Sequence, residues 1–208
     1  MFDMSEKLPV FLYGADHLTA GKALALARHE LRGILPETVR KKVRSSQEIV
    51  QKIVDNGAPV YGVNTGFGPL CTTRISPEDT RELQFNILKS HAVGVGDPLA
   101  DEIVRAMMAL RIKDFARGNA GVRSETVEAW IRLLNAGVVP VVPDKGSVGA
   151  SGDLVPLAHV GLVLIGEGEA FYNGKRISGR RALARAGLEP LALEAAEGLA
   201  LVNGTQVM

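Results

Sequence analysis

A glycine-rich loop that leads directly into an apolar helix is the feature that most constrains how this chain folds. The loop covers residues 143–152, and from residue 154 apolar and small side chains recur at helical spacing as far as residue 165. Asp153 or Ser151 is suited to cap this helix, and Pro156 is tolerated in a first turn, where backbone N–H groups lack intrahelical partners. The loop is therefore predicted at the positive end of a buried helix, where negative charge is favoured.

A loop of this kind is most often a plain turn, and in other proteins it cradles phosphate. Gly146, Gly149 and Gly152 have the spacing G-x-x-G-x-x-G, which is not the dinucleotide-binding G-x-G-x-x-G, and the G-K-[ST] ending of a P-loop is missing. Two prolines in residues 138–143 also argue against a central strand before the loop. From residue types alone, the plain turn is favoured.

The loop sequence Gly149-Ala150-Ser151-Gly152-Asp153-Leu154, followed by Pro156-Leu157-Ala158-His159, resembles the signature of the aromatic amino acid ammonia-lyases, and histidine ammonia-lyase most of all. The resemblance implies that Ala150, Ser151 and Gly152 cyclise into a methylidene-imidazolone (MIO) electrophile, with no metal and no nucleotide cofactor. The residue types suit this chemistry. A side chain at position 152 would obstruct the approach of its amide nitrogen to the Ala150 carbonyl carbon, and Ser151 would lose its hydroxyl as water to leave a methylene group.

A second match is the segment 61–68, Tyr-Gly-Val-Asn-Thr-Gly-Phe-Gly, which resembles the family's loop for its catalytic tyrosine. The resemblance implies that Tyr61 removes the substrate β-proton. A free tyrosine has a pKa of about 10, so its anion needs stabilisation, which the predicted helix start at Asp153 offers. Taken alone, Tyr61 would be an ordinary strand residue with a satisfied hydroxyl.

A third match, residues 90–96, places His91 where the lyases contact the substrate side chain, and histidine there is typical of relatives that deaminate histidine. One imidazole can hydrogen bond another, so the residue type suits that substrate. The structural alternative is a histidine that caps the end of a helix. The other histidines are assigned structural positions: the surface for His17 and His29, and helix packing for His159.

The fourth match is Asn203 in the Asn-Gly turn at residues 203–204, which resembles the family's asparagine beside the prosthetic group. Together the four motifs imply elimination of ammonia from L-histidine to give trans-urocanate. In the family's scheme the substrate amine adds to the methylene group and Tyr61 takes the β-proton. A lyase or aminomutase for another aromatic amino acid is the alternative within the family.

Composition excludes other classes of function. The 208 residues carry 24 Lys and Arg against 23 Asp and Glu, a net charge of +1, so no overall field attracts nucleic acid or membrane. Cys71 is the single cysteine, which indicates a reducing compartment. The amino terminus has no signal-peptide pattern, and the longest apolar run is shorter than the roughly 20 residues that cross a bilayer. We expect a soluble cytoplasmic protein.

Periodicity and capping signals predict a mainly α fold with a few short strands. The predicted strands cover residues 8–13 and 60–63, with a hairpin over residues 170–177 that turns at Asn173-Gly174. The resemblance implies the amino-terminal domain of the helical ammonia-lyase (fumarase/aspartase-like) fold, as a single domain over residues 1–208. The predicted helices cover residues 19–32, 36–56, 76–91, 97–115, 124–135 with Ser124 as cap, 154–165, 178–186 and 192–201.

The chain departs from the family in length. Full-length ammonia-lyases continue into long helices that form a tetramer core, and a second tyrosine, an arginine and a glutamate of the site are expected there. We therefore expect the 208-residue chain to be inactive by itself, with a homotetramer as the complete assembly. Two hypotheses stay open: the amino-terminal half of a lyase, or a catalytically silent helical module that only mediates assembly.

Overall fold

The computed structural model describes residues 8–57, 59–61, 63–65, 77–148 and 152–208. The predicted MIO residues Ala150 and Ser151 lie outside the described residues, as do Cys71 and Ser76, the first residue of the helix predicted over residues 76–91. Gly152, the third MIO residue, is described.

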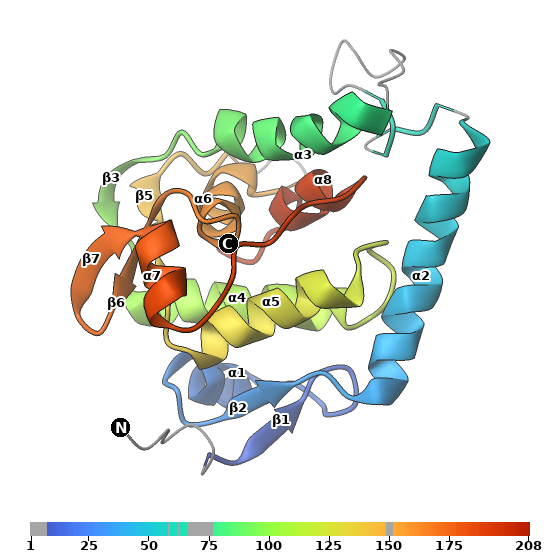
Figure 1. Cartoon of the computed structure of the whole chain (residues 1–208). Helices are drawn as coiled ribbons and strands as arrows, with labels where there is room; N and C mark the ends of the chain where they lie inside the picture. Colours follow the sequence, from blue (N-terminus) through green and yellow to red (C-terminus); the bar gives the residue numbers. More distant parts are fainter. Residues whose placement is uncertain (1–7, 58, 62, 66–76, 149–151) are drawn as a thin grey trace.

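The fold is mainly helical with a few short strands, as predicted (Figure 1). The helices are α1 (Ala20–Ala27), α2 (Glu37–Asn56), α3 (Pro77–His91), α4 (Asp101–Phe115), α5 (Ser124–Asn135), α6 (Leu154–Leu164), α7 (Gly179–Arg185) and α8 (Glu197–Val202). The strands are β1 (Val10–Leu12), β2 (Arg32–Ile34), β3 (Val95–Pro98), β4 (Val139–Pro140), β5 (Pro143–Lys145), β6 (Glu169–Tyr172) and β7 (Lys175–Ser178).

The strands form small sheets at the edges of the helical body. β1 pairs in parallel with β2, and β3 pairs antiparallel with β5. β6 lies between β4 and β7, and both pairings are antiparallel. β4 is therefore an edge strand, the position in which Pro140 is tolerated.

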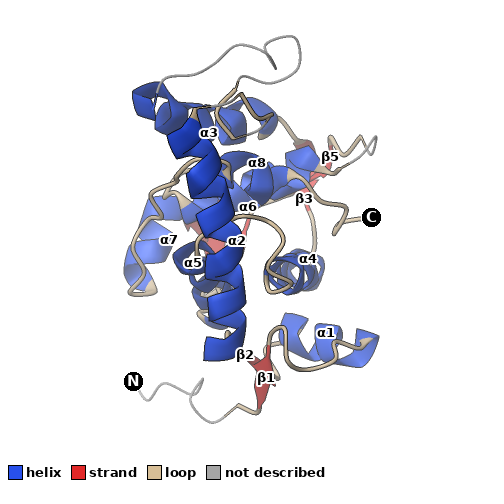
Figure 2. Cartoon of the chain, turned by 90° about the vertical axis from the view of Figure 1, so that its right-hand side faces the viewer, coloured by secondary structure: helices blue, strands red, loops and turns tan. Residues whose placement is uncertain are grey.

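The helices pack around one core, with α6 and α8 between α3 on one side and α4 and α5 on the other (Figure 1). α1 packs against α4 beside the β1–β2 pair, and the long helix α2 runs along one side of the body (Figure 2). Fully buried Phe115 and Trp130 join α4 to α5 edge to face, with ring centroids 5.9 Å apart. α3, α6 and α8 of this core carry or adjoin His91, Gly152 and Asn203.

Local signals predicted several elements correctly. α2 ends at Gly57, which adopts the left-handed conformation with φ of 67°. The β6–β7 hairpin turns at Asn173 and Gly174, with φ of 50° and 72°, the positive values that an Asn-Gly turn supplies.

Three predicted boundaries are wrong, and for two of them a distant contact replaces a local one. The helix predicted over residues 19–32 ends at Ala27, because the buried Arg105 guanidinium binds the Leu26 and Ala27 carbonyls. The helix predicted from residue 97 begins at Asp101, since residues 95–98 pair with β5 instead. The last helix begins at Glu197 rather than residue 192.

Ser124 is the first residue of α5 rather than its cap. The N-cap position belongs to Arg123, and the Ser124 hydroxyl donates to Glu125 Oε2 at 3.2 Å instead of accepting from a backbone N–H. His29 is also not a surface residue: it is partly buried, with Nδ1 3.3 Å from Arg105 Nη2.

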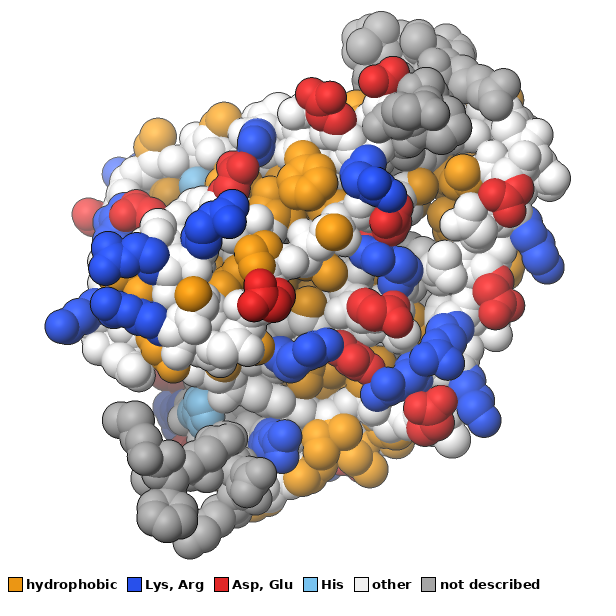
Figure 3. All heavy atoms as spheres, in the orientation of Figure 1, with side chains coloured by type: hydrophobic (Ala, Val, Ile, Leu, Met, Phe, Trp, Pro, Cys, Tyr) orange, Lys and Arg blue, Asp and Glu red, His pale blue; other side chains and the backbone are white. Residues whose placement is uncertain are grey.

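Charges of both signs are mixed on the face shown in Figure 3, in keeping with the balanced composition. Across the described residues, several charged side chains are paired between elements, including Arg40 Nη2 with Glu128 Oε1 at 2.7 Å and Arg81 Nη2 with Glu194 Oε1 at 3.2 Å. Within the described part of the chain, no helix is long and apolar enough to cross a membrane.

Candidate active site

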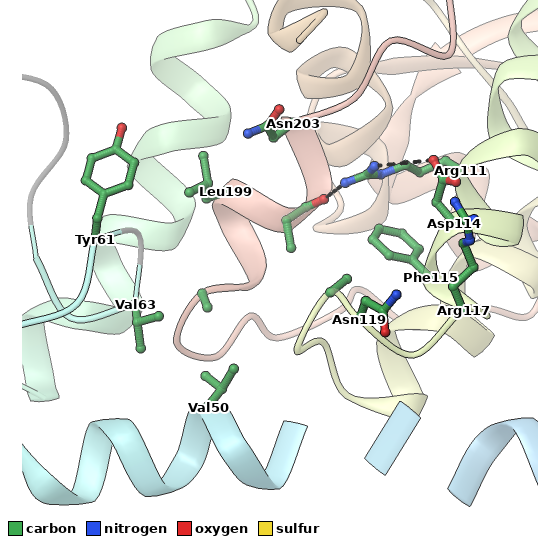
Figure 4. Close-up of a pocket in the computed structure, with 13 residues that line it drawn as sticks. Val50, Tyr61, Val63, Arg111, Asp114, Phe115, Arg117, Asn119, Leu199 and Asn203 are labelled. Carbon is green, nitrogen blue, oxygen red and sulfur yellow. Dashed lines mark hydrogen bonds and ion pairs between the residues drawn. The ribbon is translucent and has the colours of Figure 1, made fainter. Parts of the chain in front are cut away.

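A cavity of about 460 Å³ lies where four separate segments meet (Figure 4). α2 contributes Val50, the segment after α2 contributes Tyr61 and Val63, and α8 with its end contributes Leu199 and Asn203. The fourth segment is the end of α4 and the loop after it, residues 111–120. The structure therefore brings two predicted site residues, Tyr61 and Asn203, to one cavity.

Tyr61 lies on a tight turn and not on the strand predicted over residues 60–63. The N–H groups of Val63 and Asn64 donate to the Val60 carbonyl at 3.1 and 3.3 Å, and the Asn64 side-chain oxygen accepts from Val60 N at 2.8 Å. The Tyr61 side chain is 57% exposed. The buried Asn64 side chain closes the turn. Asparagine is common in turns, so this residue could have corrected the prediction of a strand over residues 60–63.

Gly152 and Asn203 lie against each other although 51 residues separate their positions in the sequence. Gly152 is buried, and a Cβ built on it would lie 2.7 Å from Asn203 Oδ1 and 3.4 Å from Gly204 N. The next residue, Asp153, donates its backbone N–H to the Gly204 carbonyl at 2.5 Å. The end of the predicted MIO loop is thus fixed to the Asn-Gly turn after α8.

Asp153 occupies the N-cap position of α6, one of the two residues predicted there, but its side chain makes no capping bond. The carboxylate is fully buried and Oδ1 accepts from the Ser147 hydroxyl, so the side chain ties the start of the loop to its end. Burial raises the pKa of this carboxyl group above its ordinary value.

Arg111 holds the turn after α8 against α4, a role that the sequence did not indicate. Its guanidinium donates to the Ala200 carbonyl and lies 4.5 Å from the centre of the Phe115 ring (Figure 4). Burial lowers the pKa of Arg111 to about 10, and the nearby Asp114 carboxylate, 3.9 Å away, opposes that shift. Asp114 also accepts from the Gln206 side-chain amide, so one pair of α4 residues holds both sides of the turn.

His91 is the last residue of α3 and does not line this cavity. Its Nδ1 lies 2.8 Å from the Ile87 carbonyl and 3.1 Å from the Ser90 hydroxyl. A carbonyl oxygen only accepts, so Nδ1 carries the hydrogen and Nε2 is the imidazole atom available to a further partner. His91 therefore makes the helix-end contact of the structural alternative and still presents one ring nitrogen.

His159, assigned to helix packing from the sequence, has a specific hydrogen bond in addition. It lies on α6, partly buried, and its Nε2 accepts from the Gly94 N–H at 3.1 Å. Burial lowers the pKa of His159, which favours the neutral imidazole that can accept. The described residues contain no cluster of three His, Cys, Asp or Glu side chains that could hold a metal ion.

Residues 18–208 match a family model described as aromatic amino acid lyase. The chain is 54% identical over 192 residues to histidine ammonia-lyase of Symbiobacterium thermophilum, and 51% identical over 193 residues to that of Streptococcus gordonii. These matches cover 92% and 93% of this chain but only 38% of each relative.

Solved structures agree with this match. Histidine ammonia-lyase from Trypanosoma cruzi has a TM-score of 0.86 at 38% identity, over 96% of this chain and 38% of that one. Tyrosine aminomutase from Streptomyces globisporus has a TM-score of 0.87 at 36% identity, over 96% and 37% of the two chains. Ergothionase from Treponema denticola has a TM-score of 0.91 at 28% identity, over 95% and 40%. The chain belongs to the aromatic amino acid lyase family.

Proposed function

We propose that this chain is the amino-terminal part of a histidine ammonia-lyase, which eliminates ammonia from L-histidine to give trans-urocanate. The observation that carries the proposal is the contact between Gly152 and Asn203, which joins the end of the loop to an amide side chain at the cavity that also holds Tyr61. Identity of 54% and 51% to proteins named histidine ammonia-lyase supports this choice of reaction within the family.

The described end of the loop fits a prosthetic group made from residues 150–152. Cyclisation requires the Gly152 amide nitrogen to approach the Ala150 carbonyl carbon, and buried Gly152 has neither a side chain nor the room for one. The MIO group supplies an electrophile for the substrate amine. The bond from Asp153 N–H to the Gly204 carbonyl fixes the residue after the ring, which limits the conformations that the loop can adopt.

Each remaining residue has one task in this proposal. Tyr61, which lines the cavity, accepts the β-proton on its side-chain oxygen. Asn203 donates or accepts a hydrogen bond beside position 152 and orients either the group or the substrate carboxylate. His91 presents Nε2 to the imidazole of the substrate, since its Nδ1 hydrogen is held by the Ile87 carbonyl.

The proposed activity belongs to the whole protein, because the matched relatives are more than twice as long as this chain. We propose that residues 1–208 form one domain of it, that the catalytic assembly is a homotetramer, and that it works in the cytoplasm. Residues 1–208 alone are expected to give no turnover.

A chimera tests the reaction, with residues 1–208 in place of the matching part of the Symbiobacterium thermophilum enzyme. We expect it to convert L-histidine to urocanate, followed by ultraviolet absorbance, and to leave L-phenylalanine and L-tyrosine nearly untouched. His91→Phe should reduce kcat/KM for histidine about tenfold, the effect of an unmatched polar group of the substrate. A chimera that folds and deaminates or isomerises tyrosine in preference to histidine would contradict the proposal.

A further inference from the structure

We propose that His159 is a positioning residue: by accepting the Gly94 N–H, it fixes the segment that follows His91 and so sets the orientation of the His91 imidazole toward the substrate. The inference rests on the proposed function, because the contact between His91 and the substrate is part of that proposal. Its structural part, the link between His159 and His91, stands on the geometry of three packed segments.

The first step is the contact between α3 and α6. Gly161 on α6 leaves room for the fully buried Leu88 of α3, and a Cβ at Gly161 would lie 2.8 Å from Leu88 Cδ2. Leu88 is one helical turn before His91, so α6 sets the position of the helix up to that turn. Beyond His91 the helix has ended, and a different contact must hold the chain.

The second step is Gly94, three residues after His91, where the chain passes against α6 and β5. A Cβ built on Gly94 would lie 3.0 Å from His159 Nε2, 3.2 Å from the Lys145 carbonyl and 3.2 Å from Pro143 Cβ. The His159 Nε2 atom is also the acceptor of the Gly94 N–H at 3.1 Å. The two residues on either side, Val93 and Val95, are 63% and 64% exposed, so this segment is anchored by the Gly94 bond to His159 and by the backbone pairing of β3 with β5 that begins at Val95.

The third step connects this anchor to the glycine-rich loop. Gly146 has a φ of 129°, and a Cβ on it would lie 3.1 Å from the Gly94 Cα and 3.0 Å from Val155 Cγ1 of α6. The start of the loop and the segment after His91 therefore meet through their backbones at Gly146 and Gly94, and the side chains of Val155 and His159 connect both to the first two turns of α6. A shift at Gly94 moves His91 relative to the loop that ends at Gly152.

Packing alone would require only the shape of the His159 ring, whereas the proposal requires an acceptor at the Nε2 position. The partly buried Gly94 N–H loses its partner when that acceptor is removed. Burial lowers the pKa of His159, and the neutral ring with its hydrogen on Nδ1 presents the Nε2 lone pair. A glutamine extends its side-chain oxygen to about the same place, and a leucine of similar size does not.

Two variants, His159→Gln and His159→Leu, separate the two roles, with exposed His17→Gln as control. In the 208-residue chain, amide hydrogen exchange at Gly94 and the NMR signal of the His91 ring report the structural link. We expect the glutamine and control variants to resemble the parent. The leucine variant should exchange Gly94 about tenfold faster, as the loss of one buried hydrogen bond allows, and should shift the His91 signal.

In the chimera, His159→Leu should reduce kcat/KM for histidine about tenfold, mostly through KM, and His159→Gln should restore most of it. Equal behaviour of the two variants in exchange, in the His91 signal and in kinetics would overturn the proposal in favour of packing. An inactive parent chimera would count against the proposed function alone, because the two NMR measurements would still confirm or refute the link from His159 to His91.

Discussion

Asn203 and Tyr61 line the same cavity, but the chain holds them in different ways. Asn203 belongs to a turn fixed by distant partners: Asp153 through Gly204, and Arg111 and Asp114 of α4 through Ala200 and Gln206. Tyr61 lies on a turn in which the Val63 and Asn64 N–H groups donate to the Val60 carbonyl, and Tyr61 itself is more than half exposed. Because distant segments hold the turn at Asn203, we expect that turn to contribute more to the free energy of unfolding than the exposed Tyr61 side chain does.

The largest expected effect comes from releasing α8, the helix that ends at Asn203. Glu197 is buried at its first turn, where the carboxylate accepts from Arg123 Nη2 at 2.7 Å and from the Thr126 hydroxyl. Glu197→Ala should lower the free energy of unfolding by about 3 kcal/mol, because it leaves those donors without their buried partner. Urea denaturation measures the loss.

The matched control for Glu197→Ala is Glu102→Gln, which breaks a half-exposed pair with Arg28 at 3.0 Å. That change should cost less than about 1 kcal/mol. Equal losses for the two variants would show that the buried contacts of Glu197 stabilise the protein no more than a half-exposed ion pair does.

The next effect is smaller and concerns the junction, the contact between Gly152 and Asn203. Gly152→Ala places a Cβ 2.7 Å from Asn203 Oδ1, so the Asn203 side chain must move away from position 152. We expect a cost of about 1–3 kcal/mol in the free energy of unfolding, as for an overpacked core site. The same substitution at Gly174, where nothing lies within 4 Å, controls for the loss of glycine, although its φ of 72° adds local strain. A Gly152→Ala chain as stable as the parent would show that the junction is loose.

A third measurement uses pH. Burial lowers the pKa of His159 below 6.5, so the unfolded chain binds a proton more readily than the folded one. The contribution of the neutral His159 side chain to the free energy of unfolding is therefore complete above about pH 6.5 and declines as the pH falls toward the folded-state pKa. In His159→Gln, the free energy of unfolding should fall less steeply between pH 7 and 5 than in the parent, because up to one proton fewer is taken up on unfolding. An unchanged slope would refute the prediction.

The smallest effect on stability is expected at Tyr61. Tyr61→Phe should change the free energy of unfolding by less than about 0.5 kcal/mol, as is usual at exposed positions. In the chimera the same change should lower kcat by about a hundredfold or more, because the proposed base is lost. A destabilisation as large as that of Gly152→Ala would contradict the comparison between the two sides of the cavity.

The elements predicted correctly from the sequence are those that neighbouring residues determine. Gly57 ends α2 and Asn173-Gly174 turns the β6–β7 hairpin through backbone conformations that these residue types favour locally. The end of α1 and the strand at residues 95–98 were missed, because Arg105 and β5, which determine them, come from distant parts of the chain.

The residues of the candidate site also divide into those that the sequence could identify and those that depend on distant contacts. The motif residues could be found by resemblance, and the lack of a side chain at position 152 was expected from the sequence because ring closure requires it. Arg111, Asp114 and His159 could not be assigned, because an arginine, an aspartate and a histidine within helices carry no signal of the carbonyl, amide or N–H they meet. The contact between Gly152 and Asn203 depends on the packing of α6 against α8, which no local pattern specifies.

The intact mass of the chimera tests the central claim most directly. If residues 150–152 cyclise where Gly152 meets Asn203, the protein is lighter than its sequence mass by two water molecules, and digestion places the loss in the peptide that contains Ser151. Ser151→Ala should have its full sequence mass and give no urocanate. A parent chimera that turns over histidine at its full sequence mass would contradict the account.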